Sequence, residues 1–206
     1  MSTTHFIVGD TCNNGCRGCI WTRRLEFLPL INLPLPDVRG RGVRIAGREP
    51  LMRTDLVDLV RALHEAGATG VEIETNGRGL AVASSVQALR DAGVTRIAIK
   101  LFASEATSWD THTRVPGSYA QTLRGIATTR RLAPRVDLVA VLVPRREEGA
   151  GLRDLLELAR RLGFSQARIE LRLAKLDLAA LPALAADVRA LRKRPPAGMR
   201  VEVATV

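Results

Sequence analysis

The sequence is poor in aromatic residues, which make up 3% of its 206 residues. Apolar residues reach 46% in total, so a hydrophobic core must be built mainly from Leu, Val, Ile and Ala. The shortage of aromatic rings also argues against a platform on which the bases of single-stranded nucleic acid could stack. We therefore do not expect a nucleic-acid partner.

Long apolar runs are missing as well. No run approaches the ~20 residues that a helix needs to cross a bilayer. The first nine residues lack the basic start and the apolar stretch of a signal peptide. We therefore expect a cytoplasmic protein with reduced thiols and no membrane partner.

Lysine is scarce: 3 Lys stand beside 28 Arg in a chain of formal net charge +10. A basic excess can indicate an anionic partner. The arginines are scattered along the chain rather than gathered in a tail, so we interpret the charge chiefly as a codon bias.

Short apolar runs alternate with helical patterns along the chain. The runs predict strands that start near residues 6, 43, 71, 95, 136 and 167. Spacings of roughly 30 residues are typical of β-α-β units and predict a parallel sheet with right-handed crossovers. A complete eight-stranded barrel takes roughly 250 residues. We therefore expect an α/β fold with one domain over residues 1–206, a partial TIM-like (β/α)6 barrel with parallel strands. Residues 178–206 should add a C-terminal helix and leave room for a short strand at 199–205.

Several helix boundaries follow from capping signals. Thr54 is predicted to cap the helix after the second strand, and Gly67 to end it. Ser118 and Gln121 predict a capping box at the start of a later helix. A last helix is expected over Leu181–Leu191.

All three cysteines follow the first predicted strand, in the pattern C-x3-C-x2-C formed by Cys12, Cys16 and Cys19. The odd count and the reducing compartment argue against disulfides, so the cluster of thiols indicates a metal. A structural zinc site takes four ligands, and His5 is the candidate for the fourth, although the first strand should hold it away. A [4Fe–4S] cluster held by three cysteines leaves one iron open for an exogenous ligand.

The cysteine loop resembles the signature of the radical S-adenosylmethionine (SAM) enzymes. Ala46-Gly-Arg-Glu-Pro50 resembles the Gly-Gly-Glu-Pro motif of that family, and Glu74-Thr-Asn-Gly77 resembles its Thr-Asn-Gly turn. The resemblance covers about residues 5–173. It implies a [4Fe–4S] cluster whose open iron binds SAM through the amino and carboxylate groups. One electron then cleaves SAM to a 5′-deoxyadenosyl radical that abstracts hydrogen from a substrate.

The resemblance also implies roles for single residues. Gly18 stands where the family usually has an aromatic residue, so backbone groups together with Ile20 or Trp21 are expected to contact adenine. Glu49 is expected to accept hydrogen bonds from the SAM ammonium. The full set of expected site residues is Cys12, Cys16 and Cys19 for the cluster, and Gly47, Glu49, Thr75, Asn76, Lys100 and Ile20 for SAM.

Lys100 interrupts the apolar strand predicted at residues 97–102. Because side chains alternate between the two faces of a strand, its large aliphatic neighbours should face the helices and Lys100 the barrel interior. A buried ammonium needs an anion. The candidates are the SAM carboxylate and the glutamates of the preceding strand, Glu72 and Glu74.

The expected function is that of a radical SAM enzyme with an oxygen-sensitive cluster and an external one-electron reductant of the flavodoxin or ferredoxin type. Residues 112–118 resemble a loop of family members that include the core alone, which favours a peptide substrate; a small metabolite is the second choice. The sequence identifies no residue that acts on the substrate. The alternative function is a non-catalytic barrel that binds zinc or a cluster and serves as a partner subunit.

Overall fold

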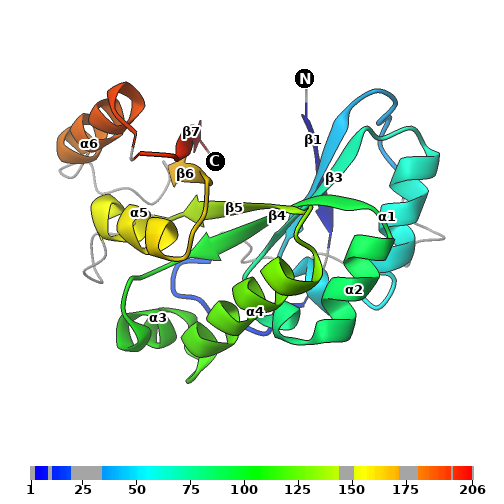
Figure 1. Ribbon diagram of the computed structural model, residues 1–206, viewed down its shortest axis with the longest axis horizontal. Helices are drawn as coiled ribbons and strands as arrows, with labels where there is room; N and C mark the ends of the chain where they lie inside the picture. Colours follow the sequence, from blue (N-terminus) through cyan, green and yellow to red (C-terminus); the bar gives the residue numbers. More distant parts are fainter. Residues whose placement is uncertain are drawn as a thin grey trace.

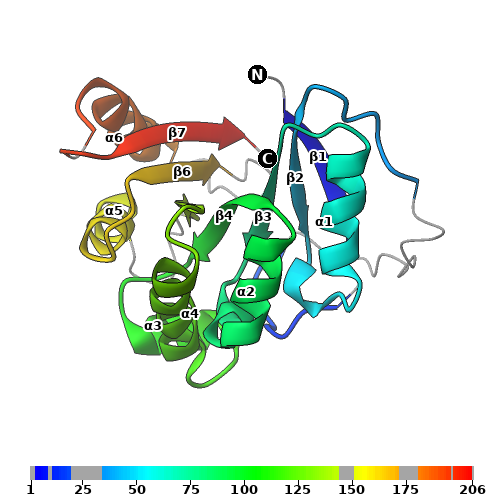
Figure 2. The ribbon, with the colours of Figure 1, turned by 45° about the vertical axis from the view of Figure 1, so that its right-hand side comes forward.

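A computed structural model describes residues 3–8, 11–19, 34–143, 151–171, 181–195 and 197–205. One curled sheet of seven parallel strands, paired in chain order from β1 to β7, forms a half-barrel (Figures 1 and 2). The predicted parallel α/β partial barrel is thus confirmed, and the segment near 199–205 adds the seventh strand. The strands are β1 (Thr3–Val8), β2 (Gly42–Gly47), β3 (Gly70–Thr75), β4 (Val94–Leu101), β5 (Asp137–Leu142), β6 (Gln166–Leu171) and β7 (Arg200–Thr205).

The helices follow one another around the outside of the curled sheet (Figure 2). None of those in the described ranges is long and apolar enough to cross a membrane. They are α1 (Leu56–Glu65), α2 (Ala83–Asp91), α3 (Ala106–Thr113), α4 (Ser118–Leu132), α5 (Leu152–Arg161) and α6 (Leu181–Lys193), with short 3-10 turns η2 (Pro50–Met52) and η3 (Arg78–Ala81).

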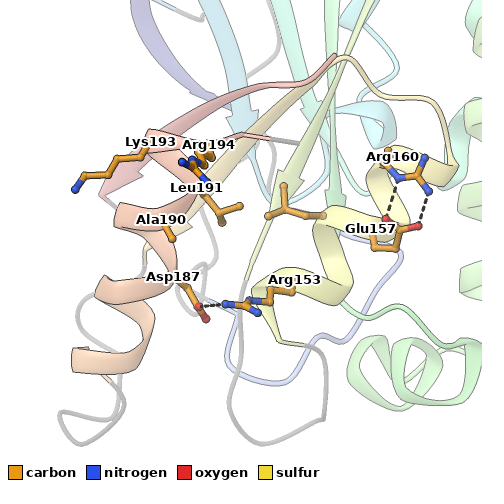
Figure 3. Close-up of a pocket in the computed structure, with 9 residues that line it drawn as sticks. Arg153, Glu157, Arg160, Asp187, Ala190, Leu191, Lys193 and Arg194 are labelled. Carbon is orange, nitrogen blue, oxygen red and sulfur yellow. Dashed lines mark hydrogen bonds and ion pairs between the residues drawn. The ribbon is translucent and has the colours of Figure 1, made fainter. Parts of the chain in front are cut away.

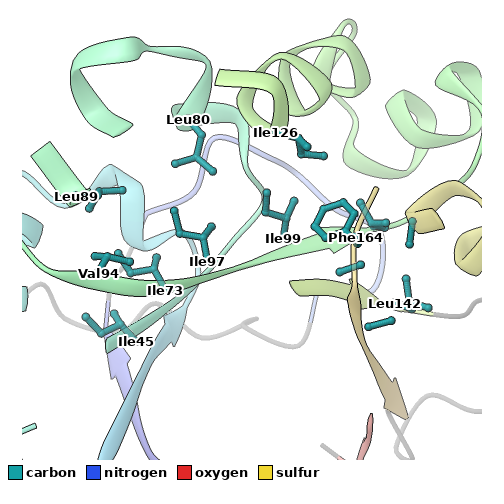
Figure 4. Packing of buried hydrophobic residues seen from close by; sticks show 14 of the residues in the cluster. Ile45, Ile73, Leu80, Leu89, Val94, Ile97, Ile99, Ile126, Leu142 and Phe164 are labelled. Atoms are coloured by element: carbon teal, nitrogen blue, oxygen red, sulfur yellow. The ribbon is translucent and has the colours of Figure 1, made fainter. Parts of the chain in front are cut away.

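The hydrophobic core lies between the sheet and these helices (Figure 4). Ile73 and Ile97 of the central strands are fully buried against residues such as Leu80 and Leu89. Each such aliphatic side chain stabilises the fold by about 1.5–3 kcal/mol. The core therefore packs against the outer face of the sheet. Its inner face and the carboxyl ends of its strands remain available for functional side chains.

The start of α1 differs by one residue from its prediction. Asp55 rather than Thr54 is the N-cap residue, and it makes no side-chain capping hydrogen bond. Gly67 follows the helix with a φ of +95°, a conformation that glycine adopts without steric cost. The predicted end of this helix is therefore confirmed.

The capping box predicted for α4 is wrong. Gly117 is its N-cap, and Ser118 is its first residue. Asp110 of α3 caps the helix instead, because its carboxylate accepts hydrogen bonds from the backbone N–H groups of Gly117 (2.6 Å) and Tyr119 (2.9 Å) and from the Ser118 hydroxyl (2.8 Å). A carboxylate at a helix N-terminus also interacts favourably with the helix dipole. The cap thus joins α3 to α4.

Candidate functional site

The three motifs meet at the carboxyl ends of neighbouring strands. The cysteine loop follows β1, Glu49 follows β2, and Thr75 and Asn76 lie at the end of β3. Parallel strands place their carboxyl ends on one rim of a β/α barrel, where active sites of this architecture lie. Segments far apart in the sequence therefore become neighbours on this rim.

Glu49 is the buried centre of this rim, with 1% of its surface exposed. Its carboxylate accepts hydrogen bonds from the Thr75 hydroxyl (2.5 Å) and from the backbone N–H groups of Asn76 (2.8 Å) and Leu51 (3.1 Å). Burial raises the pKa of Glu49 above its usual value, although these hydrogen bonds and the nearby Lys100 act in the opposite direction. The carboxylate is thus held in place, and a further cation beside it would favour its charged form.

The three cysteines are half-buried on one loop. Burial, followed by the neighbouring Cys12 and Cys19 sulfurs, raises the pKa of the Cys16 thiol to about 11. Burial also raises the pKa of Cys12. Burial and neighbouring sulfurs disfavour the thiolate forms, so a cationic metal centre is needed to stabilise them. Three cysteines bind three of the four irons of a [4Fe–4S] cluster and leave the fourth iron open. The donor chemistry therefore fits a cluster.

A single-ion zinc site would need His5 as the fourth ligand beside the three cysteines. Within the part of the chain that the structure describes, no three His, Cys, Asp or Glu side chains converge to hold one metal ion. His5 of β1 lies beside Arg44, with 3.3 Å between its Nε2 and the arginine Nη1. The structure therefore does not bring His5 to the cysteines, because β1 holds it farther back along the barrel.

The cysteine loop is fastened to the end of β3 by Asn76 of the Thr-Asn-Gly motif and by Arg78, which none of the sequence motifs includes. The Arg78 Nη1 donates to the Asn13 carbonyl oxygen and to the Asn14 side-chain oxygen (2.8 Å). Its Nε donates to the Gln121 side chain of α4 (2.6 Å). Asn76 donates to the Asn13 side-chain oxygen (2.7 Å). The loop thus has a defined shape in the protein alone.

Helix α3 supports the same loop from the other side. The backbone N–H groups of Gly15 and Arg17 donate to the carbonyl oxygens of Thr113 (2.8 Å) and His112 (2.9 Å). The His112 ring is buried, with its centroid 4.7 Å from that of Phe102. Residues 112 and 113 belong to α3 rather than to the loop expected there, and their carbonyl groups hold the cysteine segment.

The inner face of the sheet carries a network of buried ion pairs. Lys100 Nζ lies 2.8 Å from Glu74 Oε1, and Arg168 of β6 lies 2.7 Å from Glu72 and 3.5 Å from Glu74. Arg44 Nε is 2.6 Å from the same Glu72 oxygen. Although burial opposes it, the charge of Lys100 and then that of Arg168 hold the pKa of Glu74 below its usual value. The inward orientation predicted for Lys100 is confirmed, with Glu74 as its partner.

Of the two other residues predicted to bind SAM, the structure describes Gly47 but not Ile20. Gly47 has a φ of +138°, and a Cβ at this position would lie 2.0 Å from the Val8 carbonyl oxygen. The structure therefore requires glycine there for the close approach of β1 and β2. Ile20 lies outside the described residues.

A hollow of about 590 Å³ lies elsewhere, between α5 and α6 (Figure 3). The ion pairs Arg153–Asp187 (3.4 Å) and Arg160–Glu157 (2.7 Å) lie along it. None of the motif residues lines it. This hollow between α5 and α6 is therefore separate from the carboxyl ends of the strands, where the motifs meet.

Known proteins are similar to this chain in sequence and in fold. GTP 3',8-cyclase of Limosilactobacillus fermentum is 36% identical over 137 residues, which cover 61% of this chain and 40% of that protein. The AdoMet-dependent heme synthase of Nitratidesulfovibrio vulgaris is 26% identical over 166 residues, which cover 76% of this chain and 44% of that protein. The chain thus spans less than half the length of these relatives.

The fold itself matches the crystal structure of Streptococcus suis SuiB bound to S-adenosylmethionine, with a TM-score of 0.70 and 17% identity, over 99% of this chain and 50% of that chain. At this identity the match shows the fold alone. The family model described as the radical SAM superfamily matches residues 6–159, a range that contains all three motifs. Members of this family use a [4Fe–4S] cluster and SAM, and the chain belongs to the radical SAM superfamily.

Proposed function

We propose that this chain is the catalytic core of a radical SAM enzyme. The observation that carries the proposal is the junction of the cysteine loop with the buried Glu49 at the rim of the half-barrel, made through Asn76. When bound, the cluster would supply the electron that cleaves SAM to a 5′-deoxyadenosyl radical. Cys12, Cys16 and Cys19 are the proposed cluster ligands.

Glu49 is proposed to bind the SAM ammonium. Its oxygens are oriented by Thr75, Leu51 and Asn76, so the carboxylate is ready to accept another donor without rearrangement. Burial disfavours its charge, and an ammonium would relieve that cost. Thr75 and Asn76 then act by orienting this carboxylate, and Gly47 by allowing the backbone approach behind it.

Lys100 is proposed to lie at the edge of the SAM pocket. It pairs with Glu74, and its charge also acts on Glu49 and on the Cys12 thiol. We propose that the ammonium also binds the SAM carboxylate, while Glu74 retains its ion pair with Arg168. Ile20 remains the proposed adenine contact from the sequence.

The substrate is proposed to be polar, because the inner face presents charges of both signs on Arg44, Glu72, Glu74, Lys100 and Arg168. A peptide is the first candidate and a small metabolite the second. The electron donor is proposed to be an external flavodoxin or ferredoxin, and the compartment to be the cytoplasm, where an oxygen-sensitive cluster is best protected.

Anaerobic reconstitution tests the proposal. The protein should bind iron and sulfide, show a [4Fe–4S] spectrum, and produce 5′-deoxyadenosine from SAM with dithionite. The matched controls are single Ala substitutions of Cys12, Cys16 and Cys19, which should lose the cluster and the product. Retention of zinc with no SAM cleavage would instead support the non-catalytic metal-binding alternative.

A further inference from the structure

Arg78 occupies a position between two separate parts of the site. It follows the Thr-Asn-Gly turn and belongs to none of the sequence motifs. Its guanidinium donates to Asn13 and Asn14 of the cysteine loop on one side and to Gln121 of α4 on the other. The planar fork of arginine suits such divergent acceptors, whereas a lysine ammonium is a compact point charge on a flexible stem.

The backbone beneath Arg78 is firmly placed. The Asn76 side-chain oxygen accepts from the Arg78 N–H (3.0 Å), and Gly77 has a φ of +80°. Helix α4 approaches so closely that a Cβ on Gly125 would lie 2.2 Å from the Gly77 carbonyl oxygen. The backbone that carries Arg78 is thus fixed by tight packing, so the hydrogen bonds of its guanidinium hold the cysteine loop in place.

The charge of Arg78 has a second consequence at this place. A [4Fe–4S] cluster with three thiolate ligands carries net negative charge, and reduction adds one more electron. Cluster potentials depend on net charge, hydrogen bonding and solvent exposure. Arg78 is half-buried, where a positive charge acts more strongly than in water. It should stabilise the reduced form over the oxidised one.

We propose that Arg78 is a positioning residue that holds the segment between Cys12 and Cys16 in its ligating shape and makes the cluster easier to reduce. This inference rests on the proposed function, because it requires the cluster. Arg78 contacts the loop backbone and Asn14 and acts on the cluster through them. Gln121 anchors the guanidinium but adds no charge.

Two variants separate the effects of shape and charge. Arg78→Lys keeps the charge, and Arg78→Gln keeps a polar side chain without charge. Neither spans the loop and α4 together, so each loses at least one of the three hydrogen bonds of the guanidinium. Both should therefore lose iron to a chelator at least roughly tenfold faster than the wild type, the lower end of the effect expected for one hydrogen bond of a charged group. The midpoint potential should stay near the wild-type value in Arg78→Lys and move to a more negative value in Arg78→Gln.

The measurements are iron release to a chelator and a redox titration followed by electron paramagnetic resonance, both on the reconstituted protein. Arg61→Gln, in an exposed pair with Asp58 on α1, is the control and should change neither. A wild-type potential in Arg78→Gln would refute the effect of charge, and wild-type iron release in both variants would refute the positioning role. If the wild-type protein itself forms no cluster, the proposed function fails instead.

Discussion

Replacing Lys100 by Met tests the buried charge network and the SAM pocket together. Lys100 and Glu74 are both buried and lie 2.8 Å apart. Methionine keeps the apolar stem of the lysine side chain and removes its charge. The substitution therefore leaves Glu74 as a buried carboxylate that has lost its closest cation.

The loss of folding stability depends on Arg168, the cation that remains beside Glu74. Breaking a buried ion pair typically costs about 3–5 kcal/mol, because one charge is left without compensation. Arg168 still lies 3.5 Å from Glu74, so the cost should fall at the lower end, about 3 kcal/mol. For a chain of this size, that loss lowers the melting temperature by roughly 6–12 °C.

The assay is thermal and urea unfolding of the protein without SAM at neutral pH, followed by SAM binding to the reconstituted protein. The double variant Lys100→Met/Glu74→Gln removes both charges and should recover part of the lost stability. Arg61→Met, from an exposed pair, should change the stability by less than about 0.5 kcal/mol.

An unchanged melting temperature in Lys100→Met would show that the Glu74 pair contributes nothing to the fold and would refute the reasoning above. Weaker SAM binding in this variant supports a role of Lys100 at the SAM carboxylate. Unchanged SAM binding with lowered stability assigns Lys100 to the structural network alone.

Three further predictions concern neighbouring residues. Glu49→Gln should weaken SAM binding by roughly 10- to 150-fold, the loss of one hydrogen bond between charged groups, and calorimetry showing an unchanged dissociation constant would count against its role. Gly47→Ala should prevent stable folding, because its Cβ would overlap the Val8 carbonyl oxygen; a circular dichroism melt at the wild-type temperature would contradict this. Glu74 has a lowered pKa when folded, so its stabilisation is complete above the ordinary glutamate pKa of 4.5 and is lost as the pH falls below it. Acid unfolding should therefore be less steep in Lys100→Met than in the wild type; equal slopes would oppose this linkage.

Much of the fold was predictable because its signals are local. Each strand has a short apolar run, and the turn and cysteine motifs follow strands directly. Strand alternation alone placed Lys100 inside the barrel, and the ion pair with Glu74 confirms it. The choice of strand partners then follows from the parallel β-α-β rhythm.

The missed features depend on contacts that no local pattern contains. Helix α3 has little amphipathic character, and its stability comes from the buried Trp109 and His112 and from the cap that Asp110 provides to α4. Arg78 meets Asn14 and Gln121 across 64 and 43 positions of sequence. A single arginine after a turn carries no signal of such partners.

The chain order of these contacts has a consequence for synthesis on the ribosome. The residues that support the cysteine loop, from Asn76 to Gln121, all precede β5 in the sequence. A domain generally folds as a unit. All residues that hold the cysteine loop have therefore been translated before β5, β6 and β7, but the sheet on which they rest is complete only when these strands follow. Arg168, on β6, is translated after its glutamate partners on β3, so the inner charge network closes only once that strand has been made.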